Sequence, residues 1–371
     1  MMTNFDVVVI GGGAIGSACA RELALSGRKV LVVEEGGDKG QAWRAAAGLL
    51  APQIEADGDS PLVELGLGAR DLYDRLGPAL QMTTGIDIGL WREGIARIAT
   101  DQGEIASLQS QVAWQRAQGY TVEWIDAAEL RSRWPWTGPA LGALWAPEDG
   151  ALDPSRLVQA LVADAERLGA TIVTDRVRAL RKQGGRVVGV DAERSDYSAP
   201  QIVIAAGAWS SHIAGIPRSL PVQPVRGQMM ALPWPAGVER AILYHKDCYL
   251  LARGTEAILG STMEYVGYRP EVTQAGLTRI LSVAVALCPA LMRAKVRRSW
   301  AGLRPVTPDG LPIIGEEPVL EGLWYATGHG RNGILLAAMT GVLLTQLLDG
   351  REPTHNMNQF APDRFDTAVA Q

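Results

Sequence analysis

Cysteine and histidine are scarce in this chain, which has three cysteines and four histidines among 371 residues. The cysteines (Cys19, Cys248 and Cys288) are odd in number and lie outside metal-ligand spacing, and the histidines are scattered. We therefore expect neither a disulfide framework nor a metal site. The low cysteine usage favours a reducing, cytoplasmic compartment.

Charge of one sign and long hydrophobic runs are also lacking. The net charge of −5 comes from interspersed residues of both signs, which gives no basic patch for nucleic acid or for an anionic membrane. Apolar runs such as Ile334–Leu348 are short or interrupted by Gly and Thr, so we expect no transmembrane helix. The apolar start of the chain continues into a glycine motif, which argues against a signal peptide. The length and the hydrophobic content of 47% are typical of a soluble two-domain enzyme.

The N-terminus holds the pattern of a nucleotide-binding turn. Val7–Ile10 is a continuous apolar strand of the kind buried in a parallel sheet, and Gly11, Gly13 and Gly16 follow it as G-x-G-x-x-G. The first glycine permits a sharp turn, the second lets a pyrophosphate approach the backbone, and the third allows close contact between helix and strand.

The residues after this motif complete a βαβ unit. Ala14–Leu25 is predicted to be a helix whose N-terminal N–H groups face the pyrophosphate. Lys29–Val33 is predicted as the second strand, and Glu34 at its carboxyl end is placed to hydrogen-bond ribose hydroxyls and to repel the extra phosphate of NADP. The order of these elements predicts a dinucleotide site, and both NAD and FAD use such a unit.

A second glycine-rich loop near the C-terminus distinguishes the two cofactors. Gly328–Gly333 follows a predicted strand and opens the helix Ile334–Leu348, which makes another anion site far from the first in sequence. Such a helix N-terminus would stabilise negative charge on the N1–C2 edge of a reduced flavin. No second G-x-G-x-x-G follows a strand, which disfavours a reductase with both FAD and NAD(P). We therefore predict FAD.

Several motifs together resemble the FAD-dependent D-amino acid oxidase superfamily, and within it the glycine oxidases of the thiamine pathway. The motifs are VVVIGGGAIGSACA, AAAGLLAP, IAAGAW, LYHKDCYLLAR, GSTM, WAGLRPVTPDGLPIIG and GHGRNGILLA. Trp43-Arg44 departs from the small hydroxyl residues usual before AAAGLLAP. Covalently flavinylated relatives carry a cysteine near TPD; residues 299–315 have none, so the FAD is expected to be non-covalent.

The resemblance implies an α/β fold, in which a FAD-binding Rossmann-like domain of the glutathione-reductase type is interleaved with a mixed-sheet α+β substrate domain. We assign residues 1–85, 146–219 and 297–371 to the FAD-binding domain and residues 86–145 and 220–296 to the substrate domain. The resemblance also implies a homotetramer.

Four substrate-site residues follow from the resemblance. Arg304 would clamp the substrate carboxylate, Tyr249 would hydrogen-bond the same group, Met263 would line the pocket, and Arg331 would lie beside flavin and substrate. A guanidinium suits this role because it is planar and always charged, and it binds a carboxylate through two parallel hydrogen bonds. The alternatives are structural: an Arg304–Asp309 salt bridge, a buried sheet tyrosine, a core methionine and a loop arginine.

The candidate cofactor contacts come from both glycine loops, the second strand, the small-residue segment 45–52, and turns after later strands. They are Gly11, Gly13, Ala14, Ile15, Gly16, Glu34, Glu35, Ala47, Gly48, Leu49, Val177, Gly207, His329, Gly330, Arg331, Asn332, Gly333 and Ile334.

The implied activity is oxidation of glycine or another small amino acid, such as sarcosine or D-alanine. Hydride would pass to flavin N5 without a protein base, oxygen would be reduced to hydrogen peroxide, and the imine could feed thiazole synthesis. Two alternatives stay open: a dehydrogenase that uses a D-amino acid or 2-hydroxy acid with a quinone acceptor, and a non-catalytic flavin-binding module.

Overall fold

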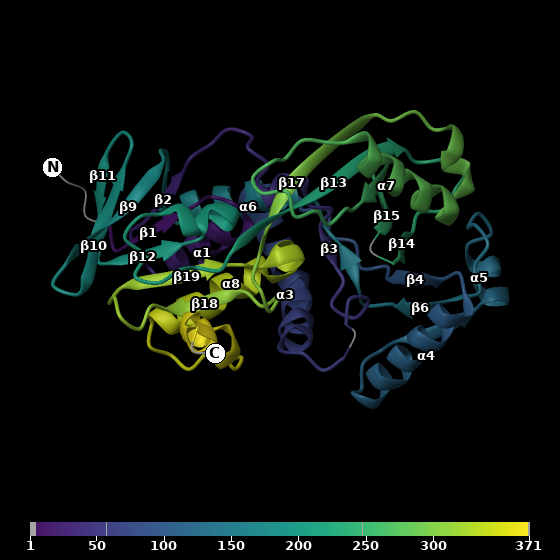
Figure 1. Ribbon diagram of the computed structural model, residues 1–371, viewed down its shortest axis with the longest axis horizontal. Helices are drawn as coiled ribbons and strands as arrows, with labels where there is room; N and C mark the ends of the chain where they lie inside the picture. The colour runs from purple at the N-terminus through teal and green to yellow at the C-terminus, as the bar shows by residue number, and fades with distance from the viewer. Residues whose placement is uncertain (1–4, 57, 247, 370–371) are drawn as a thin grey trace.

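The computed structural model describes residues 5–56, 58–246 and 248–369, with side chains to residue 366. Two sheets lie side by side along the long axis of the molecule (Figure 1). The chain crosses between them several times, so each half is assembled from separate segments. This interleaving agrees with the α/β architecture expected from the sequence.

The first sheet has six strands in the order β18-β19-β12-β1-β2-β8. Four of its five pairings are parallel, and only β18 runs antiparallel to its neighbour. The strands are rich in β-branched residues, and all but the edge strand β8 are mostly buried, as expected for a sheet covered on both faces. Their bounds are β1 Val7–Ile10, β2 Val30–Glu34, β8 Thr171–Thr174, β12 Gln201–Ile204, β18 Ile313–Glu316 and β19 Leu323–Thr327.

Four long helices pack around this sheet, namely α1 (Ala14–Leu25), α3 (Pro61–Thr84), α6 (Pro154–Arg167) and α8 (Gly333–Leu348). Helix α1 contacts both α6 and α8, and α3 contacts α8. Asp153 caps α6 by accepting hydrogen bonds from the backbone N–H groups of Ser155 and Arg156.

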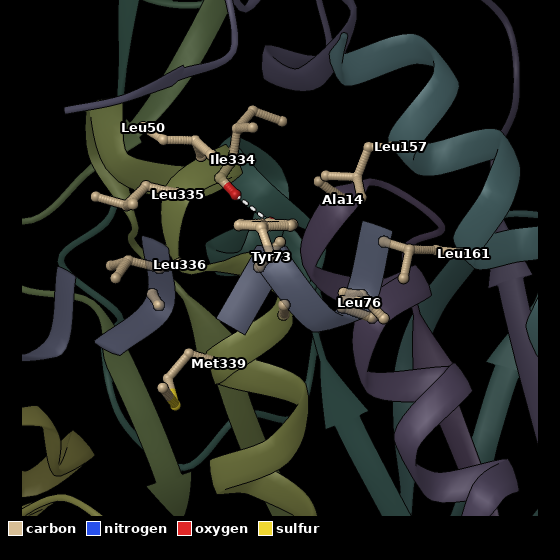
Figure 2. Close-up of a cluster of buried hydrophobic side chains, with 14 of the residues drawn as sticks. Ala14, Leu50, Tyr73, Leu76, Leu157, Leu161, Ile334, Leu335, Leu336 and Met339 are labelled. Carbon is tan, nitrogen blue, oxygen red and sulfur yellow. Dashed lines mark hydrogen bonds between the residues drawn. The ribbon is translucent and has the colours of Figure 1, made fainter. Parts of the chain in front are cut away.

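The buried side chain of Tyr73 joins α3 to the start of α8 (Figure 2). Its hydroxyl donates a hydrogen bond of 2.5 Å to the carbonyl oxygen of Ile334, among leucine side chains from four segments. This bond ties the first turn of α8 to the core. The glycine loop that precedes α8 is therefore anchored to the core through the first turn of this helix.

Helix α8 is the most apolar helix of the chain. Among the described residues, Gly330–Leu348 is long and apolar enough to cross a membrane by length and composition. The sequence analysis was therefore wrong to consider this run too short or too interrupted to span a membrane. Most residues of α8 are buried against α1, α3 and β18, which makes it a core helix.

The second sheet has eight strands in the order β17-β13-β16-β15-β14-β4-β6-β5, and only the β14–β4 pair is parallel. It is therefore the mixed sheet that the resemblance implied. The bounds are β4 Ile95–Ala99, β5 Glu123–Asp126, β6 Gly142–Ala146, β13 Gln223–Pro233, β14 Ile242–His245, β15 Cys248–Arg253, β16 Glu256–Gly260 and β17 Arg298–Val306. Helices α4 (Gln102–Ala117), α5 (Ala127–Arg133) and α7 (Gln274–Leu287) pack on it.

Strand β17 belongs to the eight-stranded sheet, where it pairs along its whole length with β13. The chain enters the six-stranded sheet only at β18. The proposed domain boundaries, including the assignment of residues 297–371 to the FAD-binding domain, remain a prediction.

Smaller elements complete the fold. A three-stranded meander turns at Gly184-Gly185. A buried ion pair fixes the segment after AAAGLL: Asp149 accepts hydrogen bonds from the backbone N–H groups of Gln53 and Ile54, and Arg70 donates to Asp149. The remaining elements are α2 Ala42–Ala45, β3 Leu49–Leu50, β7 Gly150–Ala151, β9 Val177–Gln183, β10 Arg186–Ala192, β11 Asp196–Ser198, η1 Gly207–His212, η2 Pro289–Arg293, η3 Gly330–Asn332, η4 Asn358–Phe360 and η5 Pro362–Val369.

Candidate active site

A cavity of about 620 Å³ is lined by residues of both sheets. This volume is typical of cofactor sites. The predicted residues that line it are Gly11, Gly13, Ala14, Ile15, Glu34, Glu35, Ala47, Gly48, Leu49, Val177, Gly207, Tyr249, Arg304, His329, Gly330, Arg331, Asn332, Gly333 and Ile334. Gly16 and Met263 are the two predicted residues outside this lining. The fold therefore brings together nearly all the candidate positions, although they span more than 300 residues of sequence.

The first glycine loop has the geometry that its motif requires. Gly11 has a φ of +101°, and a Cβ atom there would lie 2.6 Å from the carbonyl oxygen of Ala205 on the neighbouring strand segment. A Cβ atom on Gly16 would overlap the carbonyl oxygen of Gly11. Gly16 therefore supports the site through close packing of α1 on the loop, which explains why it does not line the cavity.

Glu34 closes the loop from the end of β2. Its carboxylate accepts a hydrogen bond of 2.6 Å from the backbone N–H of Gly12 and one of 3.2 Å from that of Gly36. These bonds fix the carboxylate at the cavity wall, where ribose binding was predicted. The next residue, Glu35, is ion-paired with Lys39 at 2.5 Å.

The indole of Trp43 lies over the second glycine of the motif and lines the same cavity. Its Cδ1 atom would lie 3.1 Å from a Cβ atom on Gly13, so a larger residue there would press against the indole. The guanidinium of Arg44 stacks on the indole, 4.3 Å from the ring centroid. The sequence analysis noted this pair as a departure from the family but did not assign it to the site. Its position just before AAAGLL was the signal that could have placed it there.

The small residues of segment 45–52 have a packing role beside the cavity. A Cβ atom on Gly48 would overlap the carbonyl oxygen of Leu152, and the methyl group of Ala45 fills the space over Gly302 of β17. The side chain of Arg253 donates to the carbonyl oxygens of Ala47 and Leu152. Tight packing and a flat cavity wall therefore both require small side chains here.

His329 is a buried imidazole in the second glycine loop, with 2% of its surface exposed. Its Nε2 atom lies 3.0 Å from the hydroxyl oxygen of Thr340. Its Nδ1 atom is buried and has no hydrogen-bond partner within the described part of the chain. Burial lowers the pKa of His329 to about 3, so the ring is neutral. A neutral imidazole with one unpaired nitrogen in a cavity wall suits a polar ligand atom.

Arg304 projects from β17 toward the cavity without a carboxylate partner among the described residues. It donates a 2.7 Å hydrogen bond to the hydroxyl oxygen of Ser261 and a 3.1 Å bond to the carbonyl oxygen of Thr262. Its guanidinium occupies the space that a side chain on Gly227 would fill. Burial lowers the pKa of Arg304, and the nearby Tyr249 opposes that shift.

The alternative role for Arg304, a salt bridge to Asp309, was wrong. Asp309 pairs instead with Arg364, with an Nε–Oδ2 distance of 2.8 Å. Tyr249 stands on β15 with 8% of its surface exposed, and its hydroxyl donates to the sulfur of Met229 at 3.3 Å and also interacts with the side chain of Ser261. Because sulfur is a weak acceptor, this hydroxyl remains available to a ligand.

Met263 lies at the edge of the site rather than in the cavity wall. Its side chain is 42% exposed, and its sulfur is 3.5 Å from a guanidinium nitrogen of Arg304. The residue is therefore no core methionine. Its place in a substrate pocket remains a prediction.

Arg331 meets two residues that the sequence did not single out. Its Nη2 atom lies 3.1 Å from a carboxylate oxygen of Glu55 and donates a 2.5 Å hydrogen bond to the hydroxyl of Tyr244. Glu55 raises the pKa of Arg331, whereas burial raises the pKa of Glu55 against the opposing charge of Arg331. Nothing in the sequence around Glu55 distinguishes it from a loop carboxylate.

Comparison with known proteins identifies the family. The model of the DAO family, described as FAD dependent oxidoreductase, matches residues 6–347. The chain belongs to this family. It is 34% identical to the glycine oxidase of Geobacillus kaustophilus over 98% of both chains. A crystal structure of glycine oxidase from that organism superimposes with a TM-score of 0.93 at 33% identity, over 97% of this chain and 99% of the other.

A further relative is the bifunctional protein ThiO/ThiG of a Nostoc species. The two sequences are 36% identical over 92% of this chain, which spans about half (52%) of the bifunctional protein. The glycine oxidase resemblance stated from the motifs is thus confirmed at the level of the family.

FAD is the cofactor of this family, and the residues of the cavity fit it. Backbone N–H groups at two helix N-termini, the Glu34 carboxylate and the unpaired Nδ1 atom of His329 provide donors and acceptors for a dinucleotide. No cysteine is among the residues that line the cavity. Within the described ranges, no group of three or more His, Cys, Asp or Glu side chains could hold a metal ion.

Proposed function

We propose that this protein oxidises glycine and other small amino acids, such as sarcosine and D-alanine, with oxygen as electron acceptor. One observation supports this most strongly. Arg304 lines the same cavity as the dinucleotide loop and has no carboxylate partner among the described residues. A buried guanidinium whose partners are a hydroxyl and a carbonyl is suited to bind an anionic ligand.

The chain's own residues bind and orient the substrate. Arg304 takes the α-carboxylate through its planar fork, and the Tyr249 hydroxyl donates a further hydrogen bond. Holding the carboxylate at two points fixes which face of the α-carbon is presented to the cofactor. Bound FAD supplies the two-electron oxidation of the amine to an imine and is reoxidised by oxygen to give hydrogen peroxide.

A role in thiazole synthesis is part of the proposal. Its support is the similarity to ThiO/ThiG, in which the matched region occupies about half of a longer protein. The imine released from glycine would be the product passed on, and its hydrolysis would otherwise give ammonia and an oxo acid.

Anaerobic mixing of the purified yellow protein with glycine, sarcosine and D-alanine tests the activity. We expect glycine to bleach the visible flavin band, and admission of air to restore it with release of hydrogen peroxide. Bleaching without recovery in air would identify a dehydrogenase that needs another acceptor. Failure of all three amines to bleach the flavin would refute the substrate assignment.

A further inference from the structure

Two arginines line the same cavity but differ in what they bind. Arg304 contacts only uncharged acceptors, whereas Arg331 is held by the carboxylate of Glu55 at 3.1 Å and by the hydroxyl of Tyr244 at 2.5 Å. Tyr244 is buried, and the side chain of Glu55 is 19% exposed. The cavity therefore offers one guanidinium that is free for an acid and one that is already occupied.

The position of Glu55 is fixed by the backbone around it. Its own N–H donates to the carbonyl oxygen of Ala51, and the N–H of Ile54 donates to the buried Asp149. The carbonyl oxygen of Ile54 accepts a 3.1 Å hydrogen bond from Arg97. Glu55 is thus placed by buried contacts on the residues next to it, rather than by a mobile loop.

We propose that Glu55 occupies Arg331 and so restricts the cavity to amino acids that carry a single acidic group. The inference rests on the proposed function, because it assumes that Arg304 binds the α-carboxylate. Glu55 and Arg331 are specificity residues here, and the excluded class is amino acids with a second carboxylate or a phosphonate.

The exclusion follows from the cost of separating a partly buried ion pair, in which the side chain of Arg331 is 37% exposed and that of Glu55 is 19% exposed. A second acidic group could reach Arg331 only by displacing Glu55, which would leave a largely buried carboxylate without its main partner. Without displacement, the second acid would lie against the negative charge of Glu55. Two further cations act on Glu55 through their charge, Arg304 and then Arg97. Arg304 is taken by the α-carboxylate, and Arg97 does not line the cavity, so neither offers a site for a second acid.

Glu55→Gln tests the proposal, since it removes the charge and keeps the size of the side chain. The FAD-loaded wild type and variant are titrated with acetate and with malonate, and binding is followed by the change in the flavin absorption spectrum. We expect the affinity for malonate relative to acetate to rise at least about tenfold, which corresponds to about 1.4 kcal/mol. The same ratio should appear in kcat/KM for iminodiacetate relative to sarcosine.

Matched variants separate selectivity from general effects. Glu321→Gln breaks an exposed pair with Arg186 at 2.9 Å on the surface and should leave the ratio unchanged. Glu55→Asp keeps the charge on a shorter side chain and should give an intermediate ratio. In the double variant Glu55→Gln with Arg331→Met, the gain for malonate should disappear.

The outcomes distinguish this inference from the proposed function. An unchanged malonate-to-acetate ratio in Glu55→Gln, with acetate binding intact, would overturn the inference alone. So would a gain that persists without Arg331. A wild type that binds neither acid would overturn the carboxylate site itself, and the proposed function with it.

Discussion

Replacement of Arg304 with alanine isolates the interaction on which substrate binding depends. The side chain is surrounded by Ser261, Thr262 and the backbone at Gly227, and its pKa is lowered by burial. No described residue forms an ion pair with this side chain, so a substrate carboxylate would be its ion-pair partner. Hydrogen bonds to a charged group contribute about 1.5–3 kcal/mol, so affinity for glycine should fall about tenfold to about 150-fold.

The assay compares substrates that differ only in the acid. Dissociation constants are measured from anaerobic flavin bleaching by glycine and by methylamine, which has no carboxylate. The loss in Arg304→Ala should be confined to glycine. Arg304→Lys keeps the charge but not the fork, and should fall between the wild type and the alanine variant.

The same experiment contains its refutation. Arg304→Ala with unaltered FAD content and wild-type affinity for glycine would show that the guanidinium does not bind the substrate. An equal loss for methylamine would indicate a disrupted cavity instead of a missing ion pair.

Three further substitutions test the site and its supports. The pKa of His329 is about 3 in the folded protein, whereas in the unfolded chain the imidazole takes up a proton near pH 6.5, so the free energy of unfolding decreases as the pH is lowered. In urea unfolding, the decrease between pH 7 and pH 5.5 should be about 1.3 kcal/mol smaller for His329→Asn than for the wild type. Gly16→Ala places a methyl group on the carbonyl of Gly11 and should cost about 3 kcal/mol and most of the bound FAD, measured by unfolding and by the absorbance ratio of flavin to protein; a stable yellow variant contradicts this. Tyr73→Phe leaves the Ile334 carbonyl without its partner and should lower the unfolding free energy by about 1–3 kcal/mol; no change would mean that water replaces the bond.

The elements that the sequence predicted well are those whose pattern is local. Strand β1 and helix α1 begin and end at the predicted residues, because the apolar pattern and the glycines that flank it lie within the segment itself. The sheet that β17 joins could not be predicted in this way. Its partner β13 lies about 70 residues earlier, and no pattern within residues 298–306 indicates which strand they pair with.

The candidate site divides in the same way. The glycine loops, Glu34, Arg304 and Tyr249 belong to motifs, and their place in one cavity agrees with the prediction that they meet. Glu55 lies outside the quoted motifs, and Tyr244 lies in LYHKDCYLLAR without a role assigned to it from the sequence. Only their contacts with Arg331 give them a role.

The sequence by itself determined the βαβ unit, the FAD family and the arginine that we expect to bind the substrate, because residue type and short spacing carry that information. Tertiary structure alone decided which arginine is free and which is occupied. Ion pairing depends on distances between segments far apart in the chain: Glu55 and Arg331 are 276 positions apart, yet their charged groups lie 3.1 Å from each other. No local pattern encodes that distance, since it is set by how the two sheets pack around the cavity.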